Sequence, residues 1–184
     1  MKRQIRRSVF ESNSSSTHSL CIATGLSESD LHFPEKVTFS FDEFGWEEDT
    51  LDTVQEKANY LYTAISHVAR SIDLLPLWKE RVQFIYDTLK KHSVECTFEG
   101  TLKCEPYVFR HSGDLAFCIS LDRDGYLDHA EGIHDFLNEV CSDEDKLLSF
   151  LFSKKSFVLT GNDNAETDVD INVDYPHEEF YKGN

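Results

Sequence analysis

The stretch DTLDTVQEKANYLYTAISHVARSI, residues 49–72, decides the fold because its apolar residues recur at alternating spacings of three and four. This period places them on one face of an amphipathic helix. Asp49 or Thr50 is positioned to cap the first amides of that helix. We therefore predict a helix from about Asp49 to Ile72 that packs an apolar stripe against a sheet. That stripe contains Leu61, Ile65 and Val68.

Patterns on either side of this helix alternate with period two and predict strands. A second helix is expected from Pro76, with Leu77, Val82, Ile85 and Leu89 on its buried face. Two further helices are expected over 127–141, where Gly132 weakens the pattern, and 143–152. The predicted strands are 18–24, 36–44, 93–100, 102–110, 113–122, 155–161 and 168–175. This order predicts a single α+β domain over 1–184, with a mostly antiparallel sheet packed against about four helices.

Composition places the chain among folded acidic proteins of the cytoplasm. The 184 residues include 34 acidic and 18 basic side chains, a net charge of −16 that opposes nonspecific binding to free duplex DNA. No apolar run approaches the roughly 20 residues of a membrane span, and none follows the first charges as in a signal peptide. The 5 cysteines are widely spaced without a CxxC pair, so we expect reduced thiols.

The charges are unevenly distributed along the chain. Lys2, Arg3, Arg6 and Arg7 make the opening basic, whereas residues 42–56 and the last 25 residues each carry seven acids. Such runs usually form a solvated surface. They also suit a protein that competes for a basic, nucleic-acid-binding partner.

The segment FESNSSSTHSL, residues 10–20, concentrates polar groups beside that basic opening. His18 is a candidate acid or base near neutral pH, and Glu11 is its candidate partner in catalysis. The candidate phosphate-binding or RNA-binding residues are Arg6, Arg7, Asn13, Ser14, Ser15, Ser16 and Thr17. We expect a compact turn anchored by Phe10 and Leu20 that brings Glu11 close to His18. The alternative is a structural loop, because such residues also satisfy backbone groups in turns.

A second polar pattern occurs near the end of the chain, in TGNDNAETDVDINVDY, residues 160–175. On a strand, Asp168, Asp170 and Asp174 share one face, which we predict to bind a partner. Hard oxygen ligands of this kind suit Mg²⁺ or Ca²⁺. Ordinary surface charge explains the alternation equally well, so no metal or other cofactor is predicted.

The segment RRSVFESNSSSTHSL, residues 6–20, resembles the opening of small proteins from bacteriophages and mobile elements of Gram-positive bacteria. Those proteins typically begin Arg-x-x-Val-Phe-Glu-Thr-Asn-Ser-Ser-Ser-Thr-His-Ser, and Ser12 stands here where Thr is usual. The ending of the chain is also similar to that group, whereas the middle is not. The resemblance, with the size and acidity, implies a type II-A anti-CRISPR protein. Some of these proteins block Cas9 loading, and others provoke truncation of its guide RNA.

Two hypotheses from different classes follow for function. The first is a phage or mobile-element inhibitor that binds Cas9 or its guide-RNA complex in the bacterial cytoplasm through an acidic surface. The alternative is an RNA-directed nuclease, or an inducer of guide-RNA cleavage, that uses Glu11 and His18. Neither hypothesis involves a membrane.

Overall fold

The computed structural model describes residues 16–45, 49–69, 72–100, 102–108, 115–121, 125–128, 132–162 and 179–183. The predicted α+β class is confirmed: helices pack with a mostly antiparallel set of strands. The helices are α1 (Val54–His67), α2 (Leu75–Lys91), α3 (His134–Val140) and α4 (Glu144–Phe152), with short 3₁₀ turns η1 (Glu28–Asp30) and η2 (Ile72–Leu74). No helix in these ranges is both long and apolar enough to cross a membrane.

The largest sheet is antiparallel and has four strands in the order β10-β1-β9-β4. These strands are β1 (Ser16–Ile22), β4 (Asp49–Leu51), β9 (Phe157–Asn162) and β10 (Glu179–Gly183). Both ends of the described chain meet here, because His18 of β1 is paired with Gly183 on one side and Thr160 on the other. The sequence did not predict β10. The strand that it predicted over 168–175 lies outside the described residues.

The helix predicted over residues 49–72 exists, but it is shorter than expected at both ends. Residues 49–51 form β4 instead, so neither Asp49 nor Thr50 is the cap. Thr53 is the N-cap and forms a capping box with Glu56, in which each side chain accepts a hydrogen bond from the other residue's backbone amide. The helix ends at His67. Residues 49–51 therefore pair with β9 as a strand, although they fit the apolar spacing of the predicted helix.

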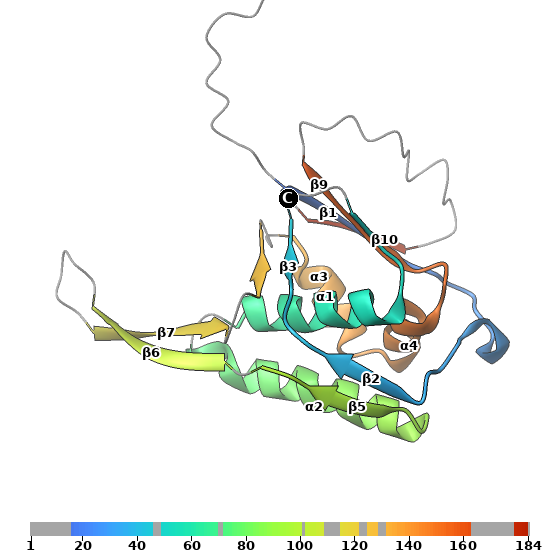
Figure 1. Ribbon diagram of the computed structural model, residues 1–184, viewed down its shortest axis with the longest axis horizontal. Helices are drawn as coiled ribbons and strands as arrows, with labels where there is room; N and C mark the ends of the chain where they lie inside the picture. Colours follow the sequence, from blue (N-terminus) through green and yellow to red (C-terminus); the bar gives the residue numbers. More distant parts are fainter. Residues whose placement is uncertain are drawn as a thin grey trace, which may run out of the picture.

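The predicted stripe on α1 packs into the core. Leu61 and Ile65 are completely buried and Val68 is partly buried, in one cluster with Leu20 of β1 and Val158 of β9. Figure 1 shows the four-stranded sheet above α1, with α2 and the parallel pair of β2 (Lys36–Phe39) and β5 (Glu95–Phe98) on the opposite side. The predicted packing of this stripe is confirmed. The helix α1 is in addition the central layer of the fold, with residues 60–66 all buried, which its one-sided apolar period does not predict.

The remaining strands form pairs. The sequence predicted one strand over 36–44, whereas the structure has β2 (Lys36–Phe39) and β3 (Glu43–Phe44) with different parallel partners, β5 (Glu95–Phe98) and β8 (Tyr126–Leu127). The antiparallel hairpin of β6 (Leu102–Val108) and β7 (Leu115–Leu121) extends away from the body (Figure 1).

The other predicted helices are present with changed bounds. Pro76 lies at the start of α2, and Ile85 and Leu89 are buried, but Leu77 is 38% exposed and does not belong to the buried face. The helix predicted over 127–141 is reduced to α3, because Leu127 joins the strand β8. The helix predicted over 143–152 is confirmed, with Asp143 as the N-cap of α4.

Candidate functional site

The structure places only part of the N-terminal polar box. Ser16, Thr17 and His18 are the first residues of β1, so the segment is extended from Ser16 and the predicted turn does not continue to Leu20. The other predicted box residues lie outside the described residues: Arg6, Arg7, Glu11, Asn13, Ser14 and Ser15.

His18 is completely buried between β1, α1 and β8. Its Nε2 atom lies 2.6 Å from the carbonyl oxygen of Asp128, and because a carbonyl only accepts, Nε2 is the donor. Its Nδ1 atom lies 3.2 Å from the hydroxyl of Tyr60, a residue of α1 whose pKa is raised by burial. This geometry joins three elements through one ring. It favours a structural role for His18, and catalysis by Glu11 and His18 stays a prediction.

The predicted partner-binding carboxylates Asp168, Asp170 and Asp174 also lie outside the described residues. Their proposed strand, and a metal on its face, stay predictions. Within the ranges that the structure does describe, no group of three or more His, Cys, Asp or Glu side chains is placed to hold a metal ion.

A surface pocket of about 560 Å³ lies between the end of β1 with the segment that follows it (residues 22–33), the C-terminal end of α2, the start of α4 and the start of β10. Its apolar lining is Ile22, Ala23, Leu26, Leu31, Phe33 and Leu148, and its polar lining is Thr24, Ser27, His92, Asp143, Asp145, Lys146, Ser149 and Glu179, with Gly25 between. This volume lies within the range of ligand pockets, roughly 300–1,000 Å³. The pocket is therefore a candidate binding site.

One wall of the pocket is an aromatic stack. The rings of Phe33 and His92 are nearly parallel, with centroids 5.2 Å apart and an interplanar angle of 9°. The Nε2 atom of His92 lies 3.1 Å from one carboxylate oxygen of Glu144, and the other oxygen accepts a hydrogen bond of 2.6 Å from Lys91. These contacts fix His92, at the end of α2, against the first turn of α4.

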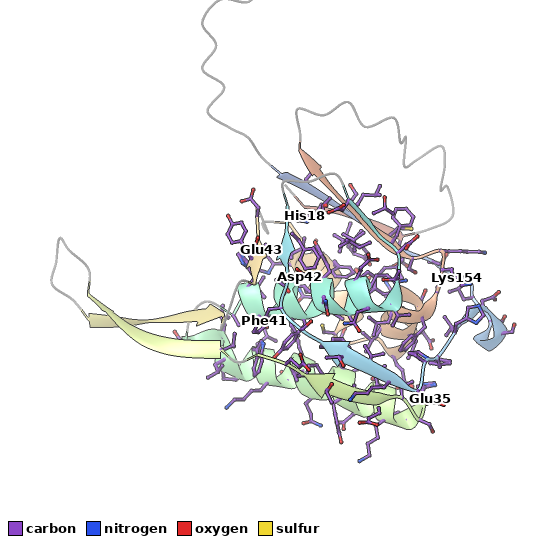
Figure 2. All side chains as sticks on the ribbon, viewed as in Figure 1. His18, Glu35, Phe41, Asp42, Glu43 and Lys154 are labelled. Carbon is purple, nitrogen blue, oxygen red and sulfur yellow. The ribbon has the colours of Figure 1, made fainter. Side chains whose placement is uncertain are left out.

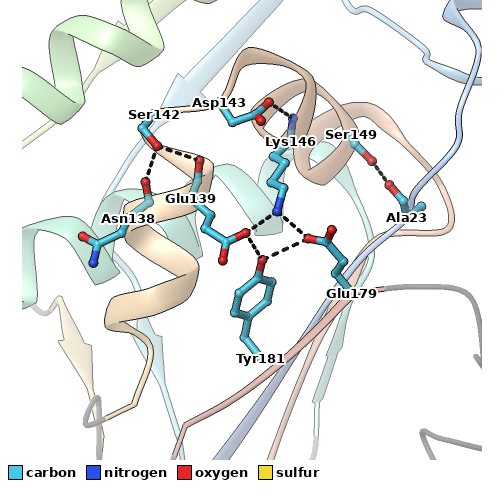
Figure 3. Close-up of polar contacts among 9 residues, drawn as sticks. All are labelled: Ala23, Asn138, Glu139, Ser142, Asp143, Lys146, Ser149, Glu179 and Tyr181. Atoms are coloured by element: carbon cyan, nitrogen blue, oxygen red, sulfur yellow. Dashed lines mark hydrogen bonds and ion pairs between the residues drawn. The ribbon is translucent and has the colours of Figure 1, made fainter.

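Two polar residues of the lining, Lys146 and Glu179, belong to a network of four side chains from α3, α4 and β10 (Figure 3). The ammonium of Lys146 contacts a carboxylate oxygen of Glu139 and lies 2.6 Å from one of Glu179. The hydroxyl of Tyr181 donates to both carboxylates, at 2.5 Å to Glu139 and 3.1 Å to Glu179. Hydrogen bonds from Lys146 and Tyr181 lower the pKa of Glu139. The hydrogen bond with Glu139, followed by that with Glu179, raises the pKa of Lys146.

This network determines the charge of the pocket. Lys146 is the only Lys or Arg in the lining, and its charge is compensated by two carboxylates. Asp143 and Asp145 are exposed, and neither forms an ion pair with any other residue that the structure describes. The Oδ1 atom of Asp143 accepts the backbone amide of Lys146 as the N-cap, which leaves its second oxygen toward solvent. The pocket therefore presents a negative rim over an apolar floor.

Sequence reasoning did not find this pocket. The sequence pattern places Asp143 only at the start of the helix predicted over 143–152, where the structure has it as the N-cap of α4, and it assigns Glu179 to no element. The local signal was the acidic run Asp143–Asp145 at a helix start. No local signal connects it with Phe33, His92 or Glu179, which come from distant parts of the sequence.

Fold and pocket together define an acidic α+β protein with a negatively charged surface pocket. The chain matches no protein-family model, and comparisons with curated proteins and with solved structures find no significant match.

Proposed function

We propose that this protein is an inhibitor that binds a basic, nucleic-acid-handling protein and competes with nucleic acid for its surface. Among such partners, the resemblance of residues 6–19 to phage and mobile-element proteins favours Cas9 or its guide-RNA complex. The site of action would then be the cytoplasm of the bacterial host.

The observation that supports this proposal is the withdrawal of cations from the surface on folding. Lys57 and Arg81 are only 1% and 4% exposed. The Arg81 guanidinium donates to the side chain of Asn138 at 2.7 Å instead of facing solvent. The ion pairs of Lys36, Lys91 and Lys146 stay at the surface, and each cancels one charge of either sign. Among the described residues, burial therefore withdraws two cations and one carboxylate, that of Asp128, from the surface. The exposed surface stays strongly negative, and such a field accelerates association with a basic partner.

Exposed carboxylates without an ion pair are part of the same surface. Asp42 lies on the segment that joins β2 to β3, Glu43 begins β3 (Figure 2), and Asp49 begins β4. All three are exposed, and none forms a salt bridge within the described ranges. These residues belong to the acidic run 42–56 of the sequence.

The test is binding to a purified type II-A Cas9–guide RNA complex at 50 and 500 mM NaCl. We expect the affinity to fall at least about tenfold at high salt, because screening weakens attraction between exposed charges. The triple variant Asp168→Asn, Asp170→Asn and Asp174→Asn is expected to bind more weakly without loss of stability. Its matched control removes three exposed charges elsewhere, with Asp73→Asn, Glu80→Gln and Asp87→Asn.

Affinity that is independent of salt would show that electrostatic competition is the wrong account. An electrophoretic gel of the guide RNA from the same mixtures tests the alternative. RNA that becomes shorter only in the presence of this protein would support cleavage or its induction instead of simple competition.

A further inference from the structure

We propose that the pocket between β1, α2, α4 and β10 binds an arginine or lysine side chain of the protein partner. This inference deepens the proposed function and depends on its basic partner. In this pocket a cationic side chain would meet both apolar residues and exposed carboxylates.

The floor of the pocket suits the aliphatic part of such a side chain. Ile22, Leu26, Leu31 and Leu148 provide aliphatic surface, and the Phe33–His92 stack provides a flat wall. Arginine and lysine bury their methylene groups along apolar surface while the charged group stays at the edge. If apolar residues flank the arginine or lysine in the partner, their side chains would fill the rest of the pocket.

The rim of the pocket suits the charged end. Asp143 is the N-cap of α4 and Asp145 lies on its first turn, and both line the pocket. Carboxylates bind a guanidinium through charge-assisted hydrogen bonds, which are stronger than neutral ones. The backbone amide of Lys146 holds the Asp143 side chain in place, so part of this rim is ordered before binding.

The same geometry argues against an anionic ligand such as a phosphate of RNA. The ammonium of Lys146 would be the natural anion-binding group, but Glu139 and Glu179 already occupy it. With Asp143, Asp145 and Glu179 against Lys146, the lining carries a formal charge of −2, from three acids and one base. This negative charge would repel an anion in the pocket. The cation of the described lining, Lys146, is already paired with Glu139 and Glu179 and does not offset the repulsion.

The test uses the full chain and NMR titration with a capped pentapeptide that has a central arginine flanked by leucines. The control peptide contains citrulline, which replaces the guanidinium with a neutral urea group. We expect the arginine peptide to shift the amide signals of Gly25 and Leu148, and the citrulline peptide to bind at least about fivefold more weakly.

The protein variant is Asp143→Asn with Asp145→Asn. Asn is as good an N-cap as Asp, so the start of α4 is preserved while both charges are removed. Its matched control is Glu80→Gln with Asp87→Asn, which makes the same charge change on the exposed side of α2, outside the pocket. We expect only the pocket variant to lose at least about fivefold affinity for the arginine peptide and for the Cas9 complex.

Equal losses in both double variants would overturn the inference, because they would indicate a general charge effect. Peptide shifts spread over the surface, or equal affinity for the citrulline peptide, would also overturn it. If the partner binds both double variants alike and with salt dependence, the pocket inference fails and the proposed function stands. If the partner shows no salt-dependent binding, the proposed function fails, and the peptide titration alone decides whether the pocket selects a cation.

Discussion

The Nζ atom of Lys57 lies 2.7 Å from the carbonyl oxygen of Ser153, although 96 positions separate these residues in the sequence. The same ammonium donates to the carbonyl of Ser156 at 2.9 Å. Lys57 is completely enclosed, and it satisfies two backbone acceptors in the segment that connects α4 to β9. A charged side chain of the central helix therefore holds the chain where it leaves the last helix and enters the sheet.

Replacing this ammonium should destabilise the protein. Lys57→Met keeps the long aliphatic chain but removes the donors, and a buried acceptor without a partner costs about 1–3 kcal/mol. We expect the free energy of unfolding to fall by about 2 kcal/mol in urea denaturation. Lys79→Met on the exposed surface of α2 is the matched control and should change it by less than about 0.5 kcal/mol. Unchanged stability of Lys57→Met would mean that water or a local shift replaces the ammonium.

The same residue predicts a pH dependence. Burial lowers the pKa of Lys57 from 10.5 to about 8, against the opposing effects of Asp52, Cys21 and Glu56. Between about pH 8 and 10.5 the unfolded chain binds more protons at this site than the folded chain, so the site's contribution to stability rises with pH. The stability difference between the wild type and Lys57→Met should therefore increase from pH 7.5 to 9.5. A constant difference would show that Lys57 keeps an ordinary pKa.

The capping box of α1 gives a third prediction. The Thr53 side chain accepts the Glu56 amide, and Glu56 accepts the Thr53 amide at 3.1 Å. Thr53→Ala should lower the free energy of unfolding by about 1 kcal/mol, whereas Thr53→Ser should stay close to the wild type because it keeps the hydroxyl. Urea denaturation of the three proteins is the measurement. Equal stability of the Ala and Ser variants would contradict a role for this cap.

The sequence was most informative where a local pattern alone decides the outcome. The three-and-four spacing around Leu61 and Ile65 identifies α1, and Asp143 correctly marks the start of α4. Local patterns gave the wrong element, or none, where a segment pairs with a strand that is distant in the sequence. Asp49 belongs to β4 because β9 is its neighbour, and no local signal reveals that Glu179 begins a strand beside β1. Likewise, a histidine at position 18 suits both catalysis and a buried hydrogen-bond network. Its partners Tyr60 and Asp128 are distant in the sequence, so only the folded structure distinguishes the two roles.

The network around Lys146 should stabilise β10 locally more than it stabilises the whole fold. Its side chains are partly exposed, and exposed ion pairs typically contribute no more than about 1 kcal/mol. Lys146→Met should therefore reduce global stability by less than about 1 kcal/mol. Hydrogen exchange at the amides of Glu179–Gly183 should become faster, because β10 loses its contact with α4. Lys155→Met, an exposed site, is the control, and equal exchange in the two variants would contradict this prediction.

The last prediction concerns His18, whose buried ring connects β1 with α1 and β8. His18→Ala leaves a cavity and removes the partner of the Asp128 carbonyl, so we expect a loss of about 3 kcal/mol in urea denaturation. Tyr60→Phe is the milder comparison, because it removes only the hydroxyl that faces Nδ1. It should cost about 1 kcal/mol.

Stability and activity must be measured on the same preparations of His18→Ala. The structural hypothesis predicts that both fall together, whereas the catalytic hypothesis predicts that only activity falls. If His18 is structural, inhibition of the partner should fall in proportion to the folded fraction and recover at low temperature, where more protein is folded. If His18 transfers protons, His18→Ala should remain folded while any RNA cleavage falls by roughly 10²-fold or more. Because the ring is completely enclosed and both its nitrogens have protein partners, we expect the first pattern.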